Sequence, residues 1–288
     1  MTIYYGPTIK AIRLEKNLPQ KEVYSGVVSR SFFSKFEKGK SDISVSKFKV
    51  LLDNLSLTFE EFLYIHNGYK NDLDLIYNRI VFFWKENMFN DLLKLYQQYN
   101  DSPFKREHHF ALLAYGLVFS VKKDTWALSS QPLIELQNYY AQKSIFTLRE
   151  IEECRVLINL LSWEDTDKLI NKALQSLKKY KQMDFNEYAR SYSQWGLIKI
   201  QHLIRKDSLK EANEFMEDMR YEVDAASMPE SYLNFKTAEI ILGLYHDNHQ
   251  WQSEGEEFIQ VMNYLDPNSW TENIAIIQIY DKLGKSRQ

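Results

Sequence analysis

Residues 20–39 read QKEVYSGVVSRSFFSKFEKG and predict two short helices joined by a turn at Gly26. Ser29 can cap the second helix, because a serine hydroxyl accepts a backbone N–H from the first helical turn. Phe33 and Phe36 are spaced so that both lie on the buried side of that helix, which leaves its polar side chains facing solvent. This is the pattern of a helix-turn-helix motif, whose second helix enters the major groove of DNA.

The polar side chains of the second helix are the candidates for contact with base edges. Arginine and lysine can donate to guanine O6 and N7, and serine can bond to several bases. Side chains that flank the helix suit phosphates, which set the register on DNA without reading its sequence. The predicted base-reading residues are Arg30, Ser31, Ser34 and Lys35. The predicted phosphate contacts are Arg13, Gln20, Lys21, Lys38, Lys40 and Ser41.

Three further predicted helices flank this pair. The first opens at the Gly-Pro pair 6–7, another covers 44–55, and the last begins at Thr58 with a capping box. The five helices resemble the phage-repressor type of helix-turn-helix domain. Its Leu-x-Gln before the turn matches 18–20, and its Ser-x-Ser-x-x-Ser-x-x-Glu-x-Gly matches 29–39.

Positive charge is concentrated near the amino end. Residues 1–49 contain ten Lys and Arg against four Asp and Glu, which gives +6, while the whole chain carries −3 and the remainder therefore −9. A basic patch in a mildly acidic protein attracts polyanions and gives an affinity that falls with salt. The alternative is a helical hairpin with a solvated charged face, which would not require this asymmetry.

The chain is too long for one such domain at 288 residues. We predict a DNA-binding domain over 1–66, a linker over 67–71 and a second domain over 72–288. The single Cys154, the lack of a charged-then-apolar leader and the lack of a long apolar run indicate a soluble cytoplasmic protein. Cys154 lies among apolar neighbours, which predicts a buried and unreactive thiol.

From residue 72 onward the apolar residues follow a helical period, which predicts an all-α protein. Successive helices joined by short turns pack as antiparallel hairpins, and their spacing is typical of an α-solenoid of tetratricopeptide-like repeats. Gly116, Gly196 and Gly243 stand mid-helix, where we expect a neighbouring helix to approach closely. The predicted helices cover 72–85, 89–99, 104–122, 131–142, 147–161, 164–181, 184–206, 208–224, 229–246, 250–264 and 269–283.

A curved stack of hairpins has a concave face that can hold an extended peptide. Arginine and lysine could bind a terminal carboxylate there, asparagine could bond to peptide backbone, and aromatic residues could hold apolar side chains. Each candidate could equally be an ordinary surface or core residue. The predicted peptide-binding residues are Arg155, Asn159, Arg190, Tyr192, Trp195, Lys199, Tyr232 and Lys236.

The sequence as a whole resembles the Rgg/GadR/MutR family of transcriptional regulators from Gram-positive bacteria. The segments SRSFFSKFEKGKSDIS at 29–44 and TFEEFL at 58–63, followed by aromatic-rich helices, carry this resemblance. It implies a quorum-sensing type of regulator, a cytoplasmic homodimer whose repeat domain binds a short hydrophobic peptide. It also implies groove-facing roles for Arg155 and Asn159. Some members have a cysteine that links the protomers where this chain has Val45, so that link cannot form.

The carboxy-terminal helix 269–283 is apolar around much of its circumference, which predicts a dimer interface formed by Ile274, Ile277 and Tyr280. The alternative is that this helix caps the last repeat. A two-fold dimer would read an inverted repeat in double-stranded DNA.

No histidine pair has the spacing of a metal site, and no phosphate-binding loop or nucleophile elbow is present. We therefore expect no enzymatic activity, no cofactor and no metal, and we expect no membrane partner. Two alternatives to peptide control remain. One is a repressor that needs no ligand, and the other is a helical-repeat scaffold that binds a partner protein.

Overall fold

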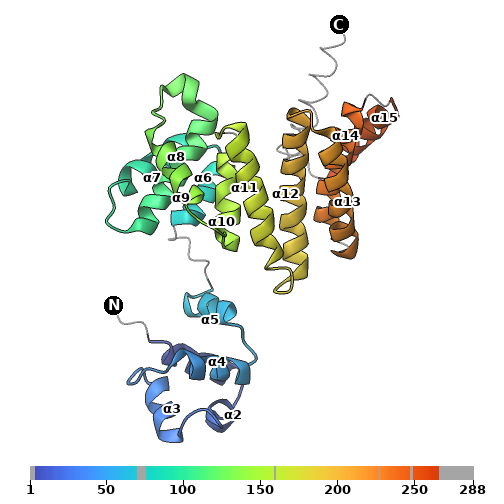
Figure 1. Cartoon of the computed structure of the whole chain (residues 1–288). Helices are drawn as coiled ribbons and strands as arrows, with labels where there is room; N and C mark the ends of the chain where they lie inside the picture. The colour runs from blue at the N-terminus through green and yellow to red at the C-terminus, as the bar shows by residue number, and fades with distance from the viewer. Residues whose placement is uncertain (1–3, 70–75, 159, 227, 247–248, 266–288) are drawn as a thin grey trace. The chain divides into compact units, whose positions relative to one another are not determined.

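The computed structural model in Figure 1 divides into two compact units, residues 1–95 and 96–288. It describes residues 4–69, 76–158, 160–226, 228–246 and 249–265. Every regular element in these ranges is helical, which confirms the predicted all-α class. The predicted domain limits stay a prediction. No helix in the described ranges has both the length and the apolar character needed to cross a membrane.

The amino-terminal unit contains the five helices that the sequence predicts, and two more follow them. Their bounds are α1 Gly6–Glu15, α2 Gln20–Tyr24, α3 Arg30–Glu37, α4 Val45–Asn54, α5 Phe59–His66, α6 Ile76–Lys85 and α7 Phe89–Tyr99. The division between the two units falls within α7.

Local chemistry fixes the helix boundaries around α3. The Ser29 hydroxyl accepts the Phe32 backbone N–H at 3.2 Å, as the sequence predicts. The turn before it places Gly26 at φ +77°, a backbone conformation that glycine adopts without steric cost. Thr58 likewise accepts the Glu61 backbone N–H at 3.0 Å at the start of α5. These caps satisfy backbone donors that the first helical turn leaves unpaired.

An aromatic core holds α1 to α5 together. Phe33 and Phe36 on α3 are fully covered, and the ring of Tyr24 on α2 lies 5.7 Å from the Phe33 ring. The Tyr5 ring stacks on Phe48 with centroids 5.3 Å apart. Burial of one face of α3 therefore turns its opposite face toward solvent.

The second unit consists of helical hairpins. Its further helices are α8 Lys105–Trp126, α9 Gln131–Ala141, α10 Leu148–Glu153, η1 Cys154–Leu157, α11 Trp163–Lys178, α12 Phe185–Arg205, α13 Leu209–Ala226, α14 Pro229–Tyr245 and α15 His249–Leu265. The 3₁₀ turn η1 continues directly from α10. The first helix of one hairpin packs on the first helix of the next, as α12 does on α14, while α12 also packs on its partner α13. Figure 1 shows α11, α12 and α14 succeeding one another along this unit.

Two mid-helix glycines allow close helix packing, as predicted. A Cβ atom at Gly196 would lie 2.7 Å from the Met219 sulfur of α13. One at Gly243 would lie 2.4 Å from the Trp251 ring of α15. A side chain at Gly196 would require the Met219 side chain to move, and one at Gly243 would require the larger Trp251 ring to move.

The structure corrects the predicted helix 147–161. It begins with the predicted capping box at Thr147, but α10 ends at Glu153 and η1 ends at Leu157. Backbone bonds of the i to i+3 type, such as Leu160 N to Leu157 O at 2.8 Å, replace the α-helical pattern there. By contrast, α8 extends to Trp126, beyond the predicted end at residue 122. The predicted helix 269–283 lies outside the described residues.

Candidate functional site

The solvent-facing side of α3 carries the predicted base-reading residues. Arg30, Ser31 and Lys35 are exposed and Ser34 is half-buried. Within the described part of the chain these side chains make no hydrogen bond or ion pair. Their donors are therefore available to an outside partner, and the positive charges of Arg30 and Lys35 favour an anionic one.

Arg13 is not a phosphate contact, which corrects the prediction from sequence. Its side chain is buried, and its guanidinium donates from Nε and Nη2 to the two carboxylate oxygens of Glu37 at 2.6 and 3.2 Å. Its Nη1 donates to the Leu18 carbonyl at 2.9 Å. The Gln20 amide also donates to Glu37, at 2.6 Å. Arg13, Gln20 and Glu37 thus join α1, α2 and α3 through one carboxylate.

The other predicted phosphate contacts differ in their access to solvent. Lys21, Lys38 and Lys40 are exposed and flank α3 along the chain, while Gln20 is half-buried and keeps a second amide hydrogen. The hydroxyl oxygen of Ser41 is covered by the protein and has no hydrogen-bond partner among the described residues. Ser41 is therefore excluded as a phosphate contact in this conformation.

In the second unit, a polar surface joins the first helices of three hairpins. Arg155 on η1 donates to Glu152 and to the Gln194 side chain on α12, the latter at 2.9 Å. Arg190, one turn from Gln194, pairs with Glu187 and lies 4.0 Å from Glu230 on α14. We call Glu152, Arg155, Glu187, Arg190, Gln194 and Glu230 the first-helix strip.

Charges on three elements of the first-helix strip act on Arg190. The hydrogen bond to Glu187 is the largest influence that raises the pKa of Arg190. The charges of Glu152 and Glu230, on two other elements, raise it further. The structure thus brings together two of the predicted groove residues, Arg155 and Arg190.

Two predicted groove residues lie in the core instead. Trp195 is 0% exposed and Tyr192 is 1% exposed, because α12 is enclosed by α11, α13 and α14. Burial also raises the pKa of Tyr192 to about 12. Neither ring can reach a bound peptide in this conformation, so their assignment to the groove is wrong.

Three other predicted groove residues lie apart from the first-helix strip. Lys199 faces α11 and α13, where its Nζ donates to Asn171 at 3.3 Å and lies 4.3 Å from the Phe215 ring centroid. Burial there lowers the pKa of Lys199. Lys236 on α14 is paired with Glu239 and with Glu254 on α15, and the exposed Tyr232 lies one turn before it. Asn159, Ile274, Ile277 and Tyr280 lie outside the described residues.

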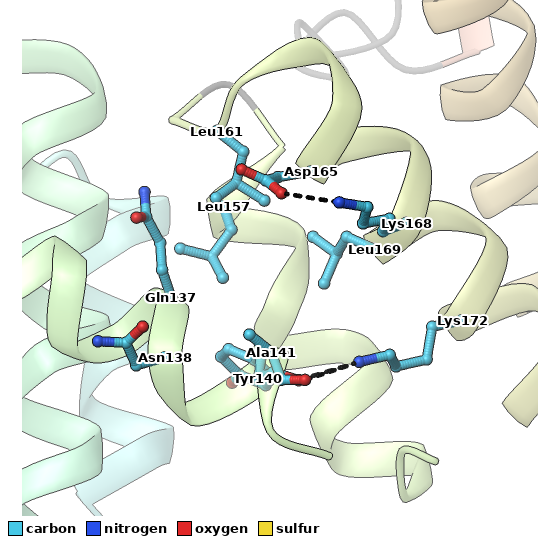
Figure 2. A pocket seen from close by; sticks show the side chains of 10 residues that line it. All are labelled: Gln137, Asn138, Tyr140, Ala141, Leu157, Leu161, Asp165, Lys168, Leu169 and Lys172. Carbon is cyan, nitrogen blue, oxygen red and sulfur yellow. Dashed lines mark hydrogen bonds and ion pairs between the residues drawn. The ribbon is translucent and has the colours of Figure 1, made fainter. Parts of the chain in front are cut away.

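Two cavities open on the side of the second helices. The α9–α11 pocket has a volume of about 290 Å³, and Figure 2 shows the side chains that line it. The α13–α15 pocket has a volume of about 440 Å³ and carries Glu214, Glu217 and Glu239 in its wall. The residues that line the α9–α11 pocket are Gln137, Asn138, Tyr140, Ala141, Leu157, Leu161, Asp165, Lys168, Leu169 and Lys172.

Several solved structures share the architecture of the whole chain. A candidate transcriptional regulator from Listeria monocytogenes EGD-e is 18% identical, with a TM-score of 0.82 over 99% of this chain and 98% of that one. A cysteine-to-serine form of the Streptococcus dysgalactiae SHP pheromone receptor Rgg2 is 17% identical, with a TM-score of 0.77 over 97% of this chain and 99% of that one. The PrgX chain of the PrgX/cCF10 complex is 16% identical, with a TM-score of 0.69 over 99% of this chain and 93% of that one.

The chain has the fold of Rgg2 and PrgX. The resemblance to the Rgg/GadR/MutR family is thereby confirmed at the level of the fold. No protein-family model matches the sequence.

Within this Rgg2-like fold, sequence reasoning missed the partners that surround Arg155 and Arg190. A signal for them was present in the sequence, because Glu187, Arg190 and Gln194 are polar and follow one another at spacings of three and four residues, which places them on one face of a helix. The α9–α11 pocket had no such signal. It depends on the end of η1, where the sequence continues to favour a helix.

Proposed function

We propose that this chain is a sequence-specific DNA-binding transcriptional regulator whose activity is controlled by a short peptide. The observation that carries the proposal is the free, basic face of α3 within a whole-chain fold like that of Rgg2 and PrgX. In this reading Arg30, Ser31, Ser34 and Lys35 contact base edges in the major groove. Lys21, Lys38 and Lys40 contact phosphates.

The peptide is proposed to bind along the first-helix strip. One of the similar structures is described as a pheromone receptor and another as a PrgX/cCF10 complex, which supports a peptide ligand for this fold. Arg155 and Arg190 are both held by carboxylates at present. A peptide carboxylate or carbonyl could replace part of these contacts, because guanidinium groups have five donors.

Base-reading and phosphate-binding residues should respond differently to substitution. Arg30→Ala should lower affinity for the preferred site by about 1–3 kcal/mol and affect mismatched duplexes little. Lys38→Ala should weaken all duplexes alike and reduce the slope of log K against log salt by about 0.9. Fluorescence anisotropy on matched and mismatched duplexes measures both effects. The same loss for both variants on every duplex would show that the assigned roles are wrong.

Removal of one guanidinium from the first-helix strip should weaken peptide binding. A small open reading frame beside the gene is the first source of a peptide to synthesise. We expect Arg155→Gln to bind that peptide about tenfold more weakly, because it loses a charge-assisted donor. Calorimetry measures the affinity.

Lys210→Gln is the matched control, because the Lys210 side chain is 90% exposed on α13 and lies away from the first-helix strip. The affinity of Lys210→Gln for the peptide should equal that of the wild type. DNA binding by Arg155→Gln in the absence of peptide should be unchanged. Equal affinity of all three proteins would contradict the assigned groove. DNA binding that ignores the peptide would favour the ligand-independent repressor.

The regulator is also proposed to act as a cytoplasmic homodimer. A two-fold dimer would place two copies of α3 about 34 Å apart, one turn of DNA, and would read an inverted repeat. A peptide could then act through different affinities for two dimer arrangements. Sizing with light scattering at micromolar concentration should give twice the 34.3 kDa chain mass. Monomeric behaviour would instead favour a terminal helix that caps the last repeat.

A further inference from the structure

The α9–α11 pocket is not used by the proposed function. It lies between the second helices of two hairpins, with Leu157 of η1 in its wall, whereas the side chains of the first-helix strip on α10, η1, α12 and α14 do not line it. Its volume of about 290 Å³ is close to the lower limit of small-molecule sites, which span about 300–1,000 Å³. An occupant must therefore be small.

The floor of the pocket is apolar. Leu157 ends η1, Leu161 follows it, and Leu169 comes from α11, so three leucines meet in the space that Figure 2 shows. Tyr140 adds apolar ring surface, because its hydroxyl bonds to Glu153 and His109, neither of which lines the pocket. A branched aliphatic group would find leucine contacts there and leave water.

The rim holds one lysine that lacks an acidic partner. Lys172 donates from Nζ to the carbonyls of Tyr140 and Ala141, both at 3.3 Å, as Figure 2 shows for the Tyr140 bond. Nζ also lies 5.3 Å from the centroid of the Phe146 ring, which is a cation–π contact and not a hydrogen bond to an acceptor oxygen. An ammonium group has three hydrogens, so one donor remains for an acceptor oxygen. No carboxylate within the described ranges pairs with Lys172. Lys168, in contrast, is paired with Glu164 at 2.8 Å and with Asp165 at 3.7 Å.

The charged side chains that line the α9–α11 pocket favour an anionic ligand. Two lysines and one aspartate line the α9–α11 pocket, which gives it a net charge of +1. The amide of the exposed Asn138 adds a neutral donor and acceptor from α9. The α13–α15 pocket differs, because three glutamates and Arg220 in its wall give a net charge of −2, which would repel an anion.

We propose that the α9–α11 pocket binds a small carboxylate with a branched apolar body. The carboxylate accepts the remaining hydrogen of Lys172 Nζ, and the apolar body lies on Leu157, Leu161 and Leu169. A free short-chain acid and the carboxyl-terminal residue of a peptide share this chemistry. The inference does not require control by a peptide in the first-helix strip, because binding is measured without DNA and without that peptide.

The test uses two acids and their amides on the full chain. 4-Methylpentanoate represents a free acid and N-acetyl-leucine represents a peptide terminus. We expect the better acid to bind with a Kd of about 1 mM or tighter, and its amide at least about fivefold more weakly, as measured by chemical-shift changes. Tighter binding of N-acetyl-leucine would point to a peptide terminus, and the reverse to a free acid. No binding of either acid at about 20 mM, or equal binding of acid and amide, would overturn the proposal.

Three variants locate the site. Lys172→Met should reduce acid binding to the level of the amide, and Lys172→Arg should keep the preference for the acid because the charge remains. Lys178→Met is the matched control, because that lysine is exposed at the end of α11 and does not line the pocket, and it should change affinity less than about twofold. Acid binding by a folded Lys172→Met variant at wild-type strength would overturn the proposal. If the Lys172→Met variant does not fold, the Lys172→Arg variant decides: loss of its preference for the acid over the amide would overturn the proposal.

Discussion

Replacing Glu37 with glutamine is expected to lower the free energy of unfolding of the amino-terminal unit by about 3–5 kcal/mol. Glu37 is 3% exposed and is the counter-charge of Arg13, which is 7% exposed. Without the carboxylate the guanidinium would stay buried with no opposite charge, and breaking a buried pair at one end costs more than removing both ends. A loss of this size is a large fraction of the stability of a small domain.

Far-UV circular dichroism and amide hydrogen exchange in α1 and α3 would measure this loss. The double variant Arg13→Met with Glu37→Leu is the matched control, because it removes both charges and replaces them with apolar groups. We expect it to recover most of the stability, since such replacements are often neutral or stabilising. A loss below about 1 kcal/mol for Glu37→Gln would show that the pair contributes little to the fold.

The substitution Gly6→Ala is expected to cost about 3 kcal/mol or more, because it overpacks the contact between α1 and α3. A Cβ atom at Gly6 would lie 1.7 Å from the Phe36 carbonyl oxygen and 2.5 Å from its carbon. Both are backbone atoms of the last turn of α3, so no side-chain rotation relieves the clash. The two helices would have to separate, and loss of DNA binding should follow.

Gly26→Ala is the matched control for Gly6→Ala. A Cβ atom at Gly26 would meet nothing within 4 Å, so only the positive φ of that residue opposes alanine. We expect a cost of about 1–2 kcal/mol, clearly smaller than at Gly6. Thermal unfolding of both variants measures the difference. Equal stabilities would mean that the close approach of α1 and α3 is not what Gly6 provides.

The parts of the fold that could be predicted from the sequence depend on chemistry between near neighbours. Ser29 caps α3, Gly26 forms the turn, and Phe33 and Phe36 lie one turn apart on its buried face. Each of these features involves residues at most a few positions apart. The exposed face of α3 follows from them directly.

The features that were missed depend on residues distant in sequence. Arg13 resembles a surface charge until Glu37, 24 residues away, is placed beside it. Trp195 resembles a groove residue because the sequence does not show that helices cover α12 on three sides. The end of η1 has no glycine or proline to mark it, and the α9–α11 pocket exists only because the chain turns there.

Selection of binding sites from random duplex DNA by the full chain at low ionic strength tests most directly whether α3 reads a DNA sequence. We predict enrichment of an inverted repeat whose half-sites are about one helical turn apart, with affinity that falls as salt rises. If no sequence is enriched over the starting pool, or if no duplex binds at all, the exposed basic face of α3 does not read DNA and the proposed regulator function is wrong.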